Sequence, residues 1–310
     1  MKRSKLFAVA ASLVCAALLF CGCAKTNTPA DVQEMYTFTD DLKRQVSVKY
    51  NANAAVCSGS FAKVWQLAGG TLCAATQDAW EESSLSLEGV IDLGSLKNPS
   101  AELILECGAD LVVLSANTKG QLELEDVLES AGMTIAYFDV ETFPEYLEML
   151  RIFTDISGKT ENYELYGESV KKRVEAAIAS CEKEEPKRIL LLRAYSSGVK
   201  AKGSDNMTGE MLSDLGAVNI ADSDTSLLED LSMERILEED PEIIFVTTMG
   251  DSSEAIKRFE ADIKSHPAFA SLTAVKEGRV YILEKDLFHN KPNARWGESY
   301  EILAKIIKGE

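Results

Sequence analysis

The feature that most constrains the fold is a helix–strand unit that occurs once in each half of the chain. The first copy has a helical segment from Glu102 and an apolar run at 111–114, and the second has a helical segment from Glu234 and an apolar run at 243–246. Short, continuous runs rich in Leu, Val and Ile predict strands that are buried on both faces, as in parallel sheets covered by helices. The repeat therefore predicts an α/β fold with two similar halves.

Other segments extend the same order through both halves. In the first half we expect a β-hairpin at 36–50, strands at 54–57, 72–75, 111–114 and 134–138, and helices at 61–68, near 102–105 and at 124–131. In the second half we expect strands at 189–192, 218–220, 243–246 and 280–283, a loop at 193–206, and helices after Thr208, near 234–237, at 255–263 and at 298–307. The two halves are therefore predicted to be Rossmann-like lobes with mostly parallel sheets.

A helix is predicted between the lobes. Apolar residues recur at helical spacing within 163–180, which contains no proline. Pro186 follows, and proline cannot continue a helix. The lobes then cover 36–158 and 186–310, and the connection at 159–185 is expected to be one long rigid helix.

The first residues are typical of a secretion signal. Three basic residues among the first five precede an apolar stretch at 6–20, which is shorter than the ~20 residues of a membrane-spanning helix. The stretch ends before a glycine and Cys23, which together resemble a bacterial lipobox. Residues 1–22 are therefore predicted to be a lipoprotein signal peptide and Cys23 the lipidation site, with plain secretion as the alternative. The polar residues 23–35 predict a flexible tether.

Composition excludes several classes of protein. Hydrophobic residues make up 46% of the chain, which supports packed cores. The net charge of −18 argues against nucleic-acid partners, because these need basic patches. Beyond Cys23, Cys57, Cys73, Cys107 and Cys181 show no CxxC spacing. Buried free thiols are therefore expected, with a Cys57–Cys73 disulfide as the alternative.

Several short motifs occur along the chain in one order. They are the hairpin start at 38–41, the Gly69-Gly70 turn, the helix start at 99–102, the strand entry at 109–112, the turn at 216–219 and the closing segment at 274–281. Together with the lipobox, they make the chain resemble the periplasmic-binding family for import of iron–siderophores, haem and vitamin B12, from about Tyr36 to the end. One departure is Lys43-Arg44, where the family hairpin usually has Gly-Arg.

The resemblance implies a class III periplasmic-binding-protein fold, in which the connecting helix limits the movement of the lobes. It also implies a lipoprotein of an ABC importer, outside the cytoplasm and anchored to the bacterial cell membrane by its lipid. Such a protein captures a metal chelate between its lobes, with a ferric siderophore favoured over haem or a cobalamin. Its partners are a permease dimer and the ATPase subunits of that permease. In similar proteins a surface glutamate of each lobe docks on the permease, a role that falls to Glu102 and Glu234; the alternative is that the helix dipole alone favours both acids.

Candidate ligand-binding residues follow the predicted strands, because ligands of open α/β sheets bind outside the carboxyl ends of the strands. The candidates are Ser58, Ser60, Trp80, Lys97 and Asn117 in the first lobe and Arg193, Tyr195, Lys202 and His289 in the second. Arg193 has the strongest case, since a guanidinium can bind anionic oxygens through two hydrogen bonds. The alternatives are a structural ion pair for Arg193 and core packing for Trp80 and Tyr195. Core packing is the favoured interpretation of Trp65 and Trp296.

Other functions are weighed against capture of a chelate. Bare Zn²⁺ or Mn²⁺ requires several converging His and carboxylate ligands, and the chain has only His266 and His289, so no metal ligand is assigned. The motifs GxSxG and HExxH do not occur, so no catalytic residue and no cofactor is assigned. An extracytoplasmic enzyme and a structural surface lipoprotein on the same fold are the alternatives. Tight chelate binding without turnover distinguishes a receptor from both.

Overall fold

The computed structural model describes residues 34–81, 84–229 and 231–310, and residues 34–310 form one compact unit. The predicted signal peptide, the lipidation site Cys23 and most of the tether lie outside the described residues. No described helix combines the length and the apolar character that a membrane span requires.

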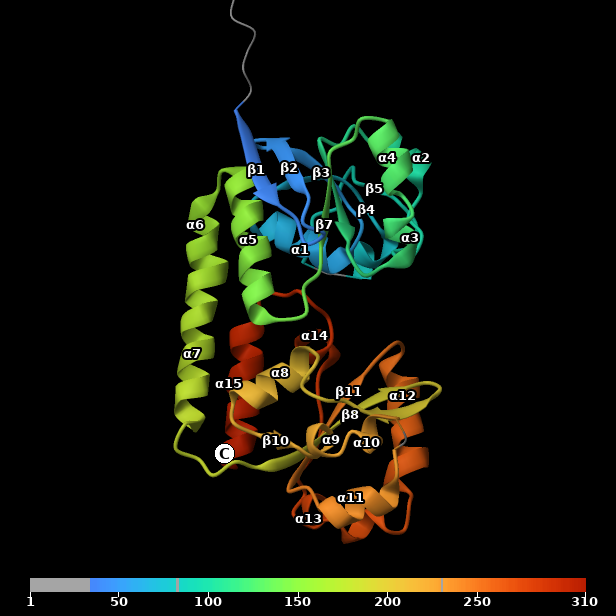
Figure 1. Cartoon of the computed structure of the whole chain (residues 1–310), viewed down its shortest axis with the longest axis vertical. Coiled ribbons are helices and arrows are strands. Elements are labelled where there is room, and N and C mark those ends of the chain that lie inside the picture. Colours follow the sequence, from blue (N-terminus) through green and yellow to red (C-terminus); the bar gives the residue numbers. More distant parts are fainter. Residues whose placement is uncertain (1–33, 82–83, 230) are drawn as a thin grey trace, which may run out of the picture. The chain divides into compact units, whose positions relative to one another are not determined.

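Two sheets organise the described chain (Figure 1). The first has the order β5-β4-β3-β6-β7, all parallel, and consists of β3 (Asn53–Val56), β4 (Thr71–Ala75), β5 (Ile91–Asp92), β6 (Leu111–Ser115) and β7 (Ile135–Phe138). The second has the parallel order β10-β8-β11-β12, with β9 antiparallel to β8, and consists of β8 (Arg188–Tyr195), β9 (Gly198–Ala201), β10 (Val218–Asn219), β11 (Ile243–Thr248) and β12 (Val280–Ile282). The predicted fold class, two lobes with mostly parallel sheets, is confirmed.

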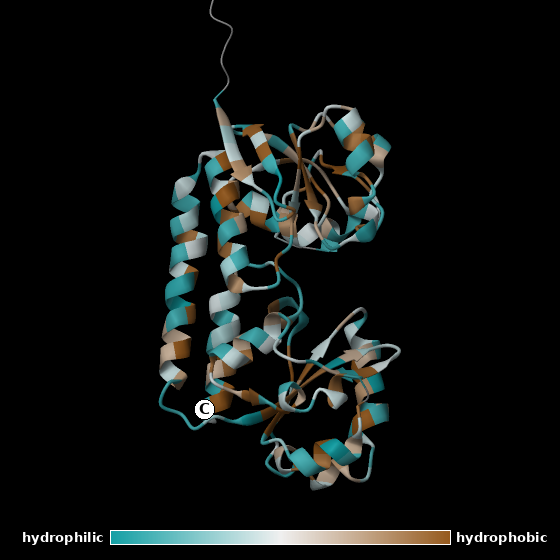
Figure 2. Cartoon of the chain, in the orientation of Figure 1, coloured by the Kyte–Doolittle hydropathy of each residue, from teal (hydrophilic) through white to brown (hydrophobic). Residues whose placement is uncertain are grey.

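Helices surround both sheets. Figure 2 shows the strands mainly in hydrophobic colours, whereas the surrounding helices carry hydrophilic stretches. In the first lobe these are α1 (Gly59–Leu67), the 3₁₀ helix η1 (Gln77–Glu81), α2 (Ala101–Glu106), α3 (Lys119–Leu122) and α4 (Glu125–Ser130). In the second lobe they are α8 (Met207–Asp214), α9 (Ile220–Ser223), α10 (Ser226–Glu229), α11 (Met233–Glu239), α12 (Ser252–Phe259), η3 (Glu260–Lys264), η4 (Phe269–Ser271), α13 (Thr273–Lys276), α14 (Lys285–Phe288) and α15 (Trp296–Lys308).

The repeated helix–strand unit of the sequence is present in both lobes. Helices α2 and α11 begin after Ser100 and Ser232, whose hydroxyl oxygens accept hydrogen bonds from backbone amides three residues later, at 3.3 and 3.4 Å. A serine at this position caps the otherwise unpaired amides of the first helical turn. Each helix leads into a strand buried along its whole length, β6 or β11, so the long apolar runs are explained by burial on both faces.

A pair of long helical segments lies between the lobes in the sequence. They are α5 (Phe143–Ser157) and a continuous run made of α6 (Thr160–Tyr163), the π-helical turn η2 (Glu164–Glu168) and α7 (Ser169–Cys181). The run contains the helix predicted at 163–180, and α15 packs against α7 (Figure 1). Helix α5 was not predicted, although Thr142 and Glu145 form a capping box at its start and Gly158 ends it in the left-handed conformation.

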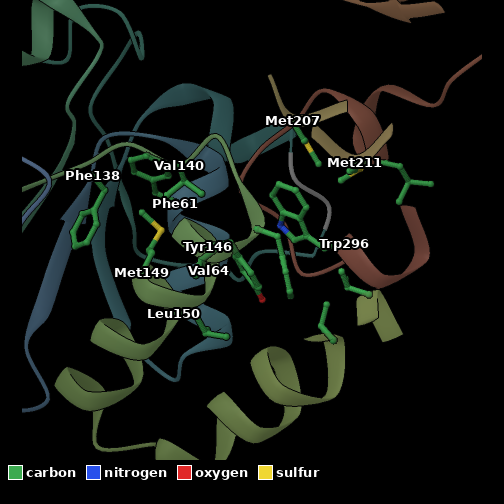
Figure 3. Close-up of a cluster of buried hydrophobic side chains, with 14 of the residues drawn as sticks. Phe61, Val64, Phe138, Val140, Tyr146, Met149, Leu150, Met207, Met211 and Trp296 are labelled. Carbon is green, nitrogen blue, oxygen red and sulfur yellow. The ribbon is translucent and has the colours of Figure 1, made fainter. Parts of the chain in front are cut away.

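One hydrophobic core extends from the first lobe into the second. Trp296, at the start of α15, is fully buried, and its ring centroid lies 5.6 Å from that of Phe143 and 6.4 Å from that of Tyr146 on α5. Met207 and Met211 of α8 approach the same indole (Figure 3). The packing roles predicted for Trp296 and for Trp65, which is also fully buried, are therefore confirmed.

The opening hairpin, β1 (Met35–Thr39) and β2 (Gln45–Lys49), is tied to the first sheet. The Arg44 guanidinium donates to Asp40 Oδ2 at 3.0 Å, to Glu125 Oε1 at 2.7 Å and to the Ile135 carbonyl at 2.7 Å. Asp40 is buried, so its charge is compensated by this arginine. Lys43, at the position where glycine was expected by resemblance, has a φ of 65°.

The four described cysteines are free thiols, and Cys57 and Cys181 are buried as expected, whereas Cys73 and Cys107 are only partly buried. The Cys57–Cys73 disulfide, which the sequence left open, is not formed. Cys57 is fully buried directly after β3, whereas the Cys73 sulfur lies 3.8 Å from the sulfur of Cys107.

Candidate functional site

A pocket of about 780 Å³ lies between the carboxyl-end loops of the two sheets. The first lobe lines it with Ser58, Ser60, Phe61, Lys63, Asp78, Glu81, Ser84, Leu96, Ser115, Asn117, Thr118, Asp139, Val140 and Glu141. The second lobe lines it with Arg193, Met249, Lys285, Asp286, His289, Asn290, Lys291, Asn293 and Arg295. Its volume falls within the range of about 300–1,000 Å³ that is usual for small-molecule sites.

The strand ends explain why these residues meet. Ser58 follows β3, Asp139 follows β7 and Met249 follows β11, while Ser115 ends β6. In a parallel sheet all carboxyl ends lie at the same edge, and the loops beyond them form the binding crevice. Both lobes therefore present to the pocket the carboxyl ends of their strands together with the loops and helices that follow them.

The first-lobe wall is held by a short hydrogen-bonded network. Asp78 accepts from the Gly59 amide at 2.7 Å and from the Thr76 hydroxyl at 2.6 Å. A Cβ on Gly59 would lie 2.7 Å from the Ala79 nitrogen, so glycine is required for this close approach. The Ser60 hydroxyl donates to the Lys291 carbonyl at 2.8 Å and so joins the two walls.

Arg193 lies near the end of β8 on the second wall. Its Nη2 donates to Asn206 Oδ1 at 3.3 Å, and its Nε is buried without a hydrogen-bond partner. No carboxylate of the described chain pairs with it within ion-pair distance, so the structural ion pair considered from the sequence is not seen. A buried N–H without a partner is costly, and an anionic ligand oxygen would satisfy it.

The pKa values of His289 and Lys291 are both lowered in the second wall. Burial, followed by the positive charges of Arg193 and Lys285, lowers the pKa of His289 to about 4, so its imidazole is neutral at pH 7. Burial also lowers the pKa of Lys291, although Asp139 opposes the shift. Lys291 forms an ion pair with Glu141 of the first wall.

The charges of the two walls differ in sign. The second wall carries four cationic side chains and one acid, namely Arg193, Lys285, Lys291, Arg295 and Asp286. The first wall carries four acids and one cation, namely Asp78, Glu81, Asp139, Glu141 and Lys63. A ligand is therefore expected to place its anionic groups toward the second lobe. In the described chain, no three His, Cys, Asp or Glu side chains are grouped as a metal-ion site would need.

The structure brings together five of the nine candidate ligand residues, and these are Ser58, Ser60, Asn117, Arg193 and His289. Lys97 lines an adjoining hollow of about 500 Å³ that shares Asn117 with the pocket. Trp80 on η1 is 45% exposed and, like Tyr195 and Lys202, does not line the pocket. The expected loop at 193–206 was wrong in part, because β8 continues to Tyr195 and turns into β9.

Several pocket residues were missed, although the strand-end rule would have found some of them. Asp139 and Glu141 come directly after β7, and Lys285 follows β12 within a few residues. Lys291 and Arg295 lie in the segment between α14 and α15, whose path is set by the packing of α15 and not by a local pattern.

Glu102 and Glu234 lie away from the pocket, in the first turns of α2 and α11. Both are exposed, and within the described chain neither forms an ion pair. Two residues beyond each of them an isoleucine is buried, Ile104 or Ile236, so the two glutamates occupy equivalent places on their lobes.

Two parallel-sheet lobes that line one pocket with their carboxyl-end loops define a two-lobed ligand-binding protein. The family model described as periplasmic binding protein matches residues 55–287, and the chain belongs to this family. The family and fold expected from the sequence motifs are thereby confirmed.

Individual relatives agree with this assignment. The chain is 23% identical to "Uncharacterized ABC transporter substrate-binding lipoprotein YvrC" of Bacillus subtilis, over 96% of this chain and 95% of that protein. It is 27% identical to "Fe(3+)-citrate-binding protein YfmC" of the same organism, over 63% of this chain and 59% of that protein. Its fold is similar to that of Staphylococcus aureus SirA complexed with staphyloferrin B, with a TM-score of 0.64 at 17% identity, over 88% of this chain and 96% of the other.

Proposed function

We propose that the protein is the substrate-binding lipoprotein of an ABC importer and captures an anionic ferric chelate between its lobes. The observation that carries the proposal is the pocket between the lobes, with the buried, unpartnered Nε of Arg193 on a cationic wall. The relatives support it, because one is named as an ABC transporter substrate-binding lipoprotein and another as a ferric-citrate-binding protein. The ligand is bound and released without turnover.

The composition of the pocket favours a hydrophilic chelate over haem. Phe61 is the single Phe, Tyr or Trp among the described lining residues, whereas ten lining residues carry charge. A large flat macrocycle needs apolar and aromatic surface for most of its burial. A ferric siderophore rich in carboxylate or hydroxyl oxygens fits the polar walls better than haem or a cobalamin does.

A titration tests the ligand and the role of Arg193. Residues 34–310 are titrated with ferric citrate, ferric hydroxamate and catecholate siderophores, haem and cobalamin, and quenching of tryptophan fluorescence is followed. Arg193→Ala should weaken an anionic ferric chelate roughly 10- to 150-fold, the range for loss of a charge-assisted hydrogen bond of about 1.5–3 kcal/mol. The matched control is Arg188→Ala at the start of the same strand, where the guanidinium pairs with Glu239 and should not affect binding. Preferential binding of haem, or equal affinities for both variants, would refute this ligand assignment.

The same function requires a membrane anchor and a docking surface. We infer that Cys23 carries the lipid, so Cys23→Ala should release the protein from membranes. We also infer that Glu102 and Glu234 contact the permease, because each is exposed at an equivalent place on its lobe. Exposed ion pairs are worth about 0–1 kcal/mol each, which suits a contact that must release after delivery.

Charge reversal tests the docking surface. Glu102→Arg with Glu234→Arg should abolish iron uptake in cells while the purified protein keeps its ligand affinity. Glu106→Arg with Glu238→Arg is the matched control, because it makes the same change of charge one turn later on the same helices. Normal uptake by the first pair, or an equal loss of uptake in the control, would disprove specific docking.

A further inference from the structure

Two cysteines of the first lobe lie in contact away from the pocket. Cys73 is in β4, and Cys107 caps the C-terminus of α2. The Cys73 thiol donates to the Cys107 sulfur at a Sγ–Sγ distance of 3.8 Å, and the Cys107 thiol donates to the Ile104 carbonyl at 3.1 Å. Both side chains are only partly buried, whereas Cys57 and Cys181 are buried. The pair therefore joins residues that are far apart in sequence and is within reach of small reagents.

The two sulfurs would have to approach each other to form a bond. A disulfide has an S–S bond of about 2.0 Å, so roughly 1.8 Å remains to be closed from the present contact. Helix α2 is a short surface helix of six residues, and Gly108 follows Cys107 with a φ of 71°. A Cβ at Gly108 would meet no atom within 4 Å. We expect the short helix end at Cys107 to make the small movement that closing this distance requires.

We propose that Cys73 and Cys107 form a disulfide bond in the protein outside the cytoplasm. A small disulfide, RSSR, is the oxidant: one cysteine sulfur attacks it and releases RSH, and the second sulfur then displaces another RSH. The two cysteines lose two electrons and two protons, and RSSR is reduced to two thiols. The oxidising setting rests on the proposed location, since disulfides persist outside the cytoplasm.

The bond would fix a functional part of the first lobe. The loop that it closes, 73–107, contains Asp78 and Glu81 of the pocket wall and Glu102 of the proposed docking helix. Linking the end of α2 to β4 would hold Glu102 in one position relative to the sheet. The reduced protein lacks this restraint on α2.

The rate of bond formation has a predictable pH dependence. Burial, followed by the proximity of Cys107, raises the pKa of the Cys73 thiol to about 12. Because the thiolate is the attacking species, oxidation is expected to be slow at pH 7 and faster at pH 9.

Peptide mapping tests the proposal on the full-length protein in mild detergent. The protein is incubated with oxidised glutathione at pH 8.5, denatured in an alkylating reagent, digested without reduction and analysed by mass spectrometry. We expect one linked peptide pair, Cys73–Cys107, with Cys57 and Cys181 alkylated. Four alkylated cysteines, stable mixed disulfides with glutathione, or a Cys57–Cys73 link would each overturn the proposal.

Cysteine-to-serine variants distinguish the proposed Cys73–Cys107 disulfide from unspecific oxidation. Cys73→Ser and Cys107→Ser should each abolish the link, whereas Cys57→Ser should retain it. Oxidation of the wild type should raise the melting temperature by about 5–10 °C, the size expected for a loop of this length, and dithiothreitol should reverse the shift. An equal shift in Cys73→Ser would overturn the assignment. None of these readouts depends on ligand binding, so their failure is distinguishable from failure of the proposed function.

Discussion

The two fully buried tryptophans differ in one hydrogen bond, and this difference can be measured. The indole N–H of Trp65 donates to the Thr71 carbonyl at 2.9 Å, whereas that of Trp296 is buried without a partner among the described residues. Both side chains are 0% exposed. Replacement by Phe removes the same atoms from each core, so the packing cost should be similar at the two sites.

The hydrogen-bond contributions have opposite signs. Trp65→Phe loses a satisfied bond, which costs about 0.5–1.5 kcal/mol. Trp296→Phe removes a buried donor whose desolvation is uncompensated, which recovers about 1–3 kcal/mol. Trp65→Phe should therefore lower the free energy of unfolding by about 1.5–4.5 kcal/mol more than Trp296→Phe does.

Urea unfolding followed by circular dichroism measures the difference, since it does not depend on the tryptophan signal. The comparison is valid if both variants unfold with the same slope in urea as the wild type. Equal losses at the two sites, or a larger loss for Trp296→Phe, would refute the reasoning and indicate that the Trp296 N–H has a partner such as a buried water.

Two further substitutions test local strain and burial of charge. Lys43→Gly should raise the free energy of unfolding, measured by thermal unfolding, by about 0.5–1 kcal/mol. The left-handed φ of 65° strains lysine, and relief of this strain should exceed the entropy that glycine loses on folding. A loss of stability would contradict this. Burial, followed by Asp214 and Glu145, raises the pKa of Glu210 to about 7, above its unfolded value of 4.5. The unfolded state therefore releases its proton first, so wild-type stability should fall relative to Glu210→Gln as pH rises from about 4.5 to 7, by about 1 kcal/mol after solvent screening. Equal pH profiles of the two proteins would count against this.

The sequence predicted those helices and strands whose buried faces produce a local pattern of apolar residues. The apolar runs within β6 and β11 were located because strands buried on both faces must be apolar throughout. The helix between the lobes was located because one of its faces is covered, by α5 near its start and by α15 along α7. Helix α5 was missed although its capping box is readable at Thr142 and Glu145, so this error was one of interpretation and not of missing information.

The site was predictable only as far as strand ends determine it. Ser58 was found because it lies just beyond the end of β3, and Arg193 because it lies within two residues of the end of β8. Tyr195 was placed near the pocket because the strand before it was predicted too short. In the structure it pairs with Gly198 in the β8–β9 hairpin and does not line the pocket. Lys291 depends on how a late loop crosses toward the first lobe, which is a long-range property.

Ion pairs and hydrogen bonds within the protein decide which cationic side chain of the second wall is available to a ligand. The Lys285 amine donates to the Gly250 carbonyl, Lys291 pairs with Glu141, and Arg295 pairs with Glu298. An anion that bound to any of these would have to compete with an existing partner, which offsets much of its attraction. Arg193 has no such acid within the described chain, and its neighbour His289 stays neutral at pH 7.

The shared core around Trp296, Phe143 and Tyr146 joins the two lobes, so we expect the two walls to move little relative to each other. In such a pocket, the affinities of different ligands depend on how well each ligand contacts groups that are already in place, and not on how far the lobes close around it. A chelate whose anionic edge reaches Arg193 therefore gains affinity without breaking an internal pair. Replacing Arg193 should change the order of preference among chelates, whereas replacing Lys285 or Arg295 should change all affinities by similar, smaller factors.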